Sequence, residues 1–356
     1  MKNYLRDDLI KLKPYKVIEK NIRHKMDANE SPWDMPKLIR EILAQELANG
    51  ISLNRYPDSN AFYLREAIGD YVQMSPSQII VGSGSDELIQ MIATAFVDKG
   101  DYVIYPTPSF GMYKISTIIA GGNPIEIPLS KEYEYDIDDF ISAIHRYSPK
   151  LLFLCSPNNP TGNLLDLSQV RELIKDFPGI VAIDEAYGEF TRDTSLRLVK
   201  EFPNLLVLRT FSKAFGLAGL RIGYCVTSPE LAEQLCKVKA PYNINSFSQR
   251  AGILTLENID LVKDRINQII NQRKFLYQAL KEIPNIKVYP SEGNFLLIRV
   301  PDGEGIWSKL LDRGILVRNF AKHPYLDNCL RVTVADETTN LKFINAMTEI
   351  LGQEEK

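Results

Sequence analysis

Short, uninterrupted apolar runs recur through the first two thirds of the chain, and each ends in a turn rich in glycine, proline or polar residues. Runs without alternation are typical of strands buried on both faces of a mainly parallel sheet. Most are separated by segments in which apolar residues recur at helical spacing, which indicates a doubly wound α/β domain. The runs lie near residues 80, 103, 152, 181, 206 and 223.

The pattern changes after residue 256. Apolar residues recur at helical spacing over residues 257–283, and Pro284 follows, which predicts one long helix. Shorter segments come next, as in a smaller α+β domain. In the last of them Arg331 alternates with apolar residues, so its side chain is expected to face solvent or a cleft. The expected strands are 286–289, 295–300, 315–317 and 330–334, and the expected helices are 306–312 and 339–351.

These patterns divide the chain into three parts, and 356 residues suffice for one large and one small domain. Residues 1–36 contain three prolines and are expected to form an irregular arm that contributes to the small domain. Residues 37–256, which begin with a helix-like segment, are assigned to the large domain. Residues 257–356 are assigned to the small C-terminal domain.

Composition narrows the class of protein. A net charge of −3 leaves no basic surface for nucleic acid. The N-terminal stretch lacks the apolar core of a secretory signal, and no apolar run is long enough to span a bilayer, so we expect a cytoplasmic protein without membrane partners. The four cysteines and three histidines are scattered, which disfavours a metal site or a cysteine–histidine nucleophile and favours an organic cofactor.

Residues 205–226 read as a strand, a polar loop and a second strand. Lys213 lies in the loop with Ser212 beside it, and Arg221 follows eight residues later. Ligands of open α/β sheets bind where strands give way to loops. A lysine amine forms a Schiff base with a carbonyl, whereas serine and arginine bind phosphate, so one phosphorylated aldehyde would engage all three residues. Taken alone, Lys213 is also compatible with an ordinary solvated lysine.

Other strand ends carry residues that suit the same ligand. The glycine-rich turn at residues 82–87 opens a helix, and its free N–H groups suit a single phosphate. It lacks the third glycine of a dinucleotide fingerprint, so a nicotinamide enzyme is the weaker alternative. Asp184 closes a buried strand, where a carboxylate is costly unless a ligand cation or hydrogen bonds satisfy it. Phe110, Asn159 and Tyr187 also lie at strand ends.

In order and spacing, these motifs make the chain similar to the fold-type I aminotransferases, which use pyridoxal 5′-phosphate. The resemblance covers most of the chain and implies a large, mainly parallel sheet domain plus a smaller α+β domain. The residue types agree with this cofactor, which needs a lysine, a carboxylate, hydrogen-bond donors, phosphate ligands and an aromatic ring. The motifs are residues 29–32, 55–58, 82–87, 156–162, 184–187, 209–221 and 292–295.

The resemblance implies a role for each residue around the cofactor ring. Lys213 would form the Schiff base with the cofactor aldehyde, and Asp184 would pair with the ring nitrogen. Asn159 and Tyr187 would bond the ring oxygen. Phe110 would stack on the ring.

The resemblance also implies how the cofactor phosphate is held. The backbone of Ser85 and Asp86 would bind it, together with Ser212 and Arg221. Tyr56 would reach the phosphate of a neighbouring subunit's cofactor, which implies a homodimer with active sites at the interface.

Substrate contacts follow from the same resemblance, which implies a phosphorylated amine as amino donor and 2-oxoglutarate as acceptor. An aromatic or broad-range aminotransferase and a threonine-phosphate decarboxylase are the alternatives within the fold. A non-catalytic regulator that binds the cofactor would usually carry a DNA-binding domain ahead of this fold, and the arm here is too short for one. The residues that match substrate contacts are Tyr15, Asn29, Arg318 and Arg331.

Overall fold

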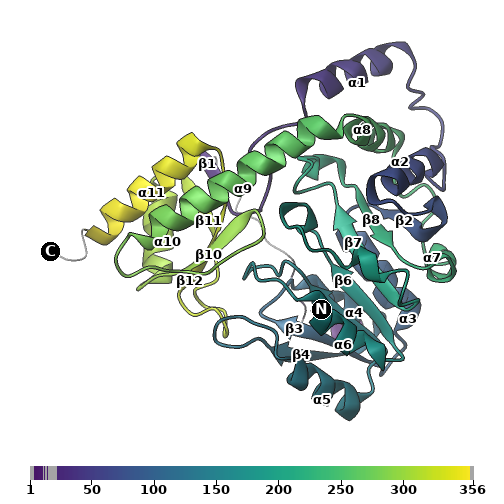
Figure 1. Ribbon diagram of the computed structural model, residues 1–356, viewed down its shortest axis with the longest axis horizontal. Helices are drawn as coiled ribbons and strands as arrows, with labels where there is room; N and C mark the ends of the chain where they lie inside the picture. The colour runs from purple at the N-terminus through teal and green to yellow at the C-terminus, as the bar shows by residue number, and fades with distance from the viewer. Residues whose placement is uncertain (1–3, 11, 13, 15–21, 353–356) are drawn as a thin grey trace.

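The computed structural model describes residues 4–10, 12, 14 and 22–352, and they form two sheets with surrounding helices (Figure 1). The larger sheet has the strand order β2-β8-β7-β6-β5-β3-β4, and all its neighbours pair in parallel except for β8, which is antiparallel to both β2 and β7. Its strands are β2 (Ile79–Gly82), β3 (Tyr102–Thr107), β4 (Asn123–Pro128), β5 (Leu151–Cys155), β6 (Ile180–Asp184), β7 (Leu205–Thr210) and β8 (Gly223–Val226).

The central strands of this sheet are buried on both faces, as their continuous apolar sequences predict. In β7, Leu205 and Val207 pack into one core, whereas Leu206 and Leu208 pack into the other. Side chains from α3, α4 and α7 complete the second core, and those from α2, α5 and α6 belong to the first. The six strands expected from the sequence are therefore confirmed. The mainly parallel α/β fold is confirmed with them.

Helices flank the larger sheet and connect its strands. At one edge, α1 packs against α8, away from the strands (Figure 1). The α-helices are α1 (Lys37–Asn49), α2 (Phe62–Val72), α3 (Ser85–Phe96), α4 (Met112–Ala120), α5 (Ile137–Tyr147), α6 (Leu167–Lys175), α7 (Pro229–Cys236) and α8 (Ser246–Glu257). Short 3₁₀ turns are η1 (Asp7–Leu9), η2 (Pro76–Gln78), η3 (Gly188–Phe190), η4 (Ser195–Leu198) and η5 (Ala218–Leu220).

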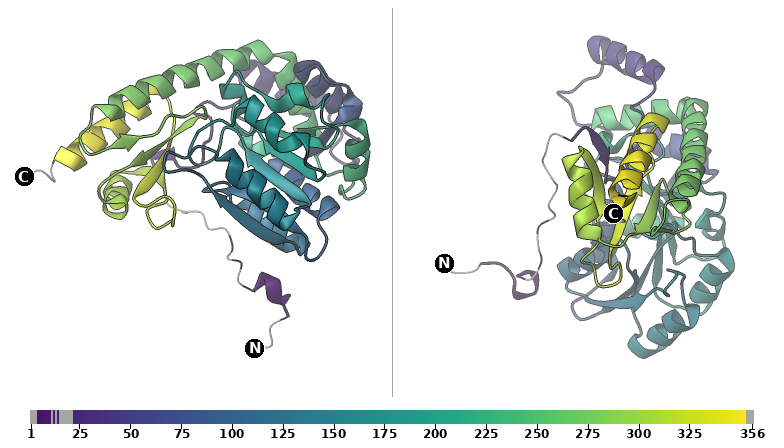
Figure 2. Two further views of the ribbon diagram at one scale, coloured as in Figure 1. Left: turned by 60° about the horizontal axis from the view of Figure 1, so that its bottom comes forward. Right: turned by 90° about the vertical axis from the view of Figure 1, so that its left-hand side faces the viewer.

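The smaller sheet has the strand order β1-β11-β12-β10-β9. The helix expected at residues 257–283 is confirmed as α9 (Ile259–Lys281), which contacts α8 at one end and α11 beside the smaller sheet (Figure 2). Among the described residues, no helix combines the length and apolar character needed to cross a bilayer. The other elements are β1 (His24–Met26), β9 (Lys287–Val288), β10 (Phe295–Arg299), α10 (Gly303–Asp312), β11 (Ile315–Asn319), β12 (Cys329–Thr333) and α11 (Glu337–Gly352).

Two strands were not expected from the sequence. β1 comes from the arm and pairs in parallel with β11, although its three residues show no strand-like apolar pattern. β4 is the edge strand of the larger sheet. Its two prolines and its partly exposed side chains give it no continuous apolar run in the sequence. The division of the chain at residues 36 and 256 remains a prediction.

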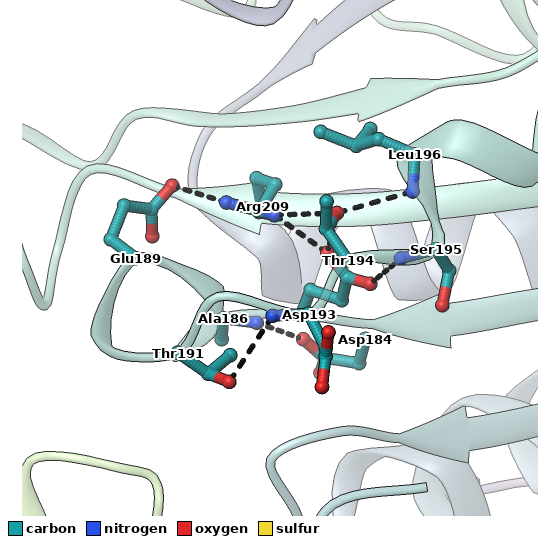
Figure 3. Close-up of polar contacts among 10 residues, drawn as sticks. Asp184, Ala186, Glu189, Thr191, Asp193, Thr194, Ser195, Leu196 and Arg209 are labelled. Atoms are coloured by element: carbon teal, nitrogen blue, oxygen red, sulfur yellow. Dashed lines mark hydrogen bonds and ion pairs between the residues drawn. The ribbon is translucent and has the colours of Figure 1, made fainter. Parts of the chain in front are cut away.

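A buried ion cluster holds the loop that follows β6 against β7 (Figure 3). The Arg209 guanidinium on β7 donates to Glu185 Oε2 at 2.7 Å and to Glu189 Oε1 at 2.7 Å, and all three side chains are at most 6% exposed. It also donates to Thr194 Oγ1 at 2.9 Å, while Glu185 accepts the backbone N–H of Ser195. Because Glu185 directly follows Asp184, this cluster fixes the position of the β6 end.

Replacing Arg209 with leucine should lower the free energy of unfolding by about 3–5 kcal/mol, because two buried carboxylates lose their cation. Urea denaturation at a fixed protein concentration measures this. The matched control is Arg171→Leu, since the pair between Arg171 and Glu201 is about half exposed and its loss should have little effect. Equal losses in the two variants would contradict a stabilising role for the buried cluster.

Candidate active site

A cavity of about 390 Å³ lies where β5, β6 and β7 end. Strands that run in parallel bring their carboxyl ends to the same edge of the sheet, which is where open α/β folds bind ligands. The smaller sheet contributes Arg331, and the segment before α1 contributes residues 28–30. The cavity brings together Asn29, Ser85, Asp86, Phe110, Asn159, Asp184, Tyr187, Ser212, Lys213, Arg221 and Arg331 from the residues singled out in the sequence.

Lys213 extends from the loop after β7 into this cavity. Its Nζ donates a hydrogen bond to the backbone oxygen of Ala28 at 2.9 Å. Burial, assisted by the nearby Arg331, lowers the pKa of Lys213 to about 8, against the opposing effect of Glu30 and Asp86. More of this amine is therefore neutral and nucleophilic near neutral pH than of a solvated lysine.

Asp184 closes β6 and is 3% exposed. Its Oδ1 accepts the backbone N–H of Ala186 at 3.0 Å, and its Oδ2 accepts the hydroxyl of Tyr113 at 2.8 Å. Burial raises the pKa of Asp184 to about 6, although these two hydrogen bonds oppose the shift. A carboxylate in this setting is suited to a ligand cation that enters the cavity.

The glycine-rich turn and Arg221 form a cradle for an anion at the start of α3. Gly84 has φ +81°, and a Cβ there would lie 2.4 Å from Nη2 of Arg221. A Cβ on Gly223 would lie 2.5 Å from the backbone nitrogen of Ser85. Arg221 Nη2 also donates to Asp86 Oδ2 at 3.0 Å. Since the first N–H groups of a helix lack intrahelical acceptors, this tight approach places them beside a guanidinium.

Arg331 is buried, at 6% exposure, and lines the cavity, so of the two expected settings, solvent or a cleft, it occupies the cleft. Both faces of β12 are covered, which removes the exposed side that alternation suggested. The guanidinium donates to Asn159 Oδ1 through Nη1 and to the backbone oxygen of Asp27 through Nη2, each at 2.5 Å. It therefore links the smaller sheet to the end of β5.

Asn29 adopts a left-handed conformation, with φ 54°, between the two sheets. Its side-chain amide donates to the hydroxyl of Tyr187 at 2.9 Å, and its backbone N–H donates to Thr333 Oγ1 at 2.9 Å. The Tyr187 hydroxyl that was assigned to the cofactor thus already accepts one hydrogen bond within the protein.

Two of the described residues assigned from the sequence, Tyr56 and Arg318, do not line this cavity. Tyr56 is 81% exposed and stacks on Tyr242 at 4.5 Å between ring centroids. Arg318 lies on β11 opposite Arg331, with its guanidinium 6.0 Å from the ring of Phe320. Tyr15 lies outside the described residues. The roles given to the site residues by the resemblance remain predictions.

The sequence analysis missed two residues that shape the site. The hydroxyl of Tyr113 donates to Asp184, but in the sequence this residue looks like part of the apolar face of α4. Its position three residues after Phe110 was the available signal that it lies near the site. Thr210 lines the cavity and exchanges hydrogen bonds with Ser212, donating from Oγ1 at 3.0 Å and accepting from the backbone N–H at 3.1 Å. Thr210 was read as loop, whereas it is the last residue of β7.

Comparison with known proteins defines the class: residues 24–347 match the model of the family "Aminotransferase class I and II", and the chain belongs to that family. It is 45% identical over 352 residues to histidinol-phosphate aminotransferase of Caldanaerobacter subterraneus subsp. tengcongensis, covering 99% of this chain and 100% of the relative. Two crystal structures share the fold. Histidinol-phosphate aminotransferase from Sinorhizobium meliloti, in complex with pyridoxal-5′-phosphate, has a TM-score of 0.90 at 24% identity, covering 99% of each chain. The enzyme from Clostridium acetobutylicum has 0.85 at 26% identity, covering 93% of this chain and 99% of that one.

Enzymes of this family use pyridoxal 5′-phosphate, and the residues around the cavity fit it. Lys213 would supply the amine for the aldehyde, and its lowered pKa favours the neutral form that such a reaction needs. Asp184 is a carboxylate without a cation among its two hydrogen-bond partners, as a pyridinium nitrogen requires. The cradle of Gly84, Ser85 and Arg221 offers helix N–H groups and a guanidinium to a phosphate, and a side chain at Gly84 would collide with that guanidinium.

The lowered pKa of Lys213 predicts a pH dependence for cofactor loading. Burial penalises the ammonium, so the neutral amine should appear as the pH rises through about 8 instead of the ordinary 10.5. The rate at which cofactor-free protein develops the absorbance of lysine-bound pyridoxal phosphate, measured from pH 6 to 11, tests this. A midpoint near 10.5 would show that the amine is solvated and contradict the buried position.

Proposed function

We propose that this chain transfers the amino group of histidinol phosphate to 2-oxoglutarate, giving imidazole acetol phosphate and glutamate, a step of histidine biosynthesis. The observation that carries the reaction type is the convergence of Lys213, Asp184 and the anion cradle at Arg221 on one cavity. The identity of 45% over nearly the full length of a relative named histidinol-phosphate aminotransferase supports the substrate.

Pyridoxal phosphate supplies an aldehyde that captures the substrate amine and a cationic ring that withdraws electrons from the substrate's α-carbon. Lys213 Nζ is the base that removes the α-proton, because its lowered pKa of about 8 makes the neutral amine accessible near neutral pH. The same Nζ would hold this proton and give it back later in the transfer. Ala28 is in position to orient the amine, since its carbonyl oxygen accepts from Nζ at 2.9 Å.

Asp184 holds a proton on the ring nitrogen. As a carboxylate it stabilises the positive charge there, and burial strengthens this interaction because the surroundings are poorly polarisable. Asn159 and Tyr187 would hold the ring through hydrogen bonds to its oxygen. Phe110 on the cavity wall stacks on the ring face and excludes water from it.

Arg331 binds the anionic end of each substrate. Its guanidinium is buried in the cavity wall and held by Asn159 and Asp27, so it is preorganised to meet a carboxylate or phosphate. Asn29 lies beside it in the same cavity. Arg318 on the next strand and Tyr15 complete the proposed contacts.

We further propose that the chain acts as a cytoplasmic homodimer. Tyr56 and Tyr242 form an exposed aromatic pair that lines a second cavity, of about 570 Å³, with Arg55 and Leu53. Exposed apolar side chains of this size favour contact with a partner. In the dimer Tyr56 would reach the phosphate cradle of the other subunit, which accounts for its distance from the cradle of its own chain.

An amino-donor assay tests the proposed function. Glutamate should form from 2-oxoglutarate at least tenfold faster with histidinol phosphate than with phenylalanine, and Lys213→Ala should abolish turnover because the base is lost. Faster turnover of phenylalanine would favour an aromatic or broad-range aminotransferase. Release of carbon dioxide from threonine phosphate would favour the decarboxylase instead.

A further inference from the structure

Tyr113 is a fully buried residue of the first turn of α4, outside the cavity wall. Its ring stacks on Phe153 of β5 with 5.0 Å between centroids and 17° between planes, and meets Phe110 edge-on at 5.8 Å. These contacts leave its hydroxyl pointing at Asp184, to which it donates at 2.8 Å. The packing of the ring therefore holds the Tyr113 hydroxyl in place as a hydrogen-bond donor to the Asp184 carboxylate.

We propose that Tyr113 is a positioning residue that fixes the carboxylate of Asp184 toward the cofactor's ring nitrogen and keeps it ionised at neutral pH. The inference rests on the proposed function and adds a residue that touches neither substrate nor cofactor. Its two parts, orientation and ionisation, come from separate observations.

The orientation follows from the two donors that meet the carboxylate. Oδ1 accepts from the backbone N–H of Ala186 and Oδ2 accepts from Tyr113, so rotation of the group about its terminal bond would break both hydrogen bonds. The N–H of Ala186 belongs to the chain just after β6, and Tyr113 comes from a helix on one face of the sheet. Each oxygen retains a lone pair for a third partner.

The ionisation state of the Asp184 carboxyl group depends on the groups that surround it. Burial favours the neutral acid, and the nearby carboxylates of Asp86 and Glu185 favour it further. Cys155, Tyr135 and Tyr187 also interact with Asp184, and none of these three is a cation in its charged form. The hydroxyl of Tyr113 is the largest influence that lowers the pKa of Asp184, ahead of the N–H of Ala186.

The consequence concerns the proton shared with the cofactor. If Asp184 became more basic, the proton would reside on its carboxyl group and the ring nitrogen would lose its charge. The ring would then withdraw electrons less strongly, and removal of the α-proton by Lys213 would slow. Substrate binding by Arg331 would not change, so the effect should appear in kcat and leave KM within about twofold.

Tyr113→Phe removes the hydroxyl and keeps both ring contacts. In the holoenzyme loaded with pyridoxal phosphate labelled with ¹⁵N in the ring, the ring-nitrogen resonance should move toward the unprotonated position between pH 6 and 8. The acid limb of the kcat profile should shift upward by about one pH unit, since a hydrogen bond to a charged group is lost. At neutral pH kcat should fall about twofold, as a limb near pH 6 moves to near pH 7.

Tyr135→Phe is the matched control. Its hydroxyl is also fully buried, donates to the backbone oxygen of Cys155 at 2.7 Å and makes no hydrogen bond to Asp184. This variant should leave the ¹⁵N resonance and the acid limb in place. Incorporation of 3-fluorotyrosine at position 113, which strengthens the donor without removing it, should shift the acid limb downward and keeps the test open if Tyr113→Phe does not fold.

Three outcomes overturn the inference. An unchanged ¹⁵N resonance and acid limb in Tyr113→Phe would show that the hydroxyl is not needed, and equal shifts in the Tyr135→Phe control would show a general packing effect. An acid limb that stays in place with 3-fluorotyrosine would show that donor strength is irrelevant. Failure of the proposed function is distinguishable, because the unmodified protein would then fail to transaminate or to bind the cofactor through lysine.

Discussion

The burial of an amine and a carboxylate in one cavity is the constraint on which the rest of the structure depends. Lys213 and Asp184 lie at the ends of neighbouring strands, and both groups are withdrawn from water. Withdrawal lowers the pKa of the amine and raises that of the carboxyl group, which moves both toward neutral pH. The same displacement suits the lysine to the proposed role of nucleophile and base, and suits the acid to the proposed pairing with a cationic ring.

The protein offsets the cost of this arrangement with rigid surroundings. The Arg209 cluster holds the residue after β6 against β7, and Tyr113 bonds the last residue of β6 from one face of the sheet. The segment at residues 27–30 approaches from the other side. Its backbone oxygens accept from Lys213 and Arg331, and Asn29 bonds Tyr187. A short segment from near the start of the chain thereby joins the two sheets at the site.

The sequence predicted the strands whose side chains are buried on both faces of the sheet. β7 reads as a strand because apolar side chains cover both of its faces, and the turn before α3 reads as an anion site because glycines allow the close approach. β4 and β1 were not predicted, because the edge position of β4 and the short length of β1 leave no apolar pattern in the sequence. For Arg331 the alternation left solvent and a cleft both open, since it cannot reveal what packs on the polar side of a strand. Tyr113 looked like core because its ring is core, and only its hydroxyl serves the site.

Reduction of the protein with borohydride after incubation with pyridoxal phosphate tests the central claim most directly, because it makes a lysine Schiff base permanent. Digestion and mass spectrometry then locate the added group. The account predicts stoichiometric labelling of the peptide that contains Lys213. Labelling of a different lysine, or none at all, would contradict the assignment of this cavity as the cofactor site.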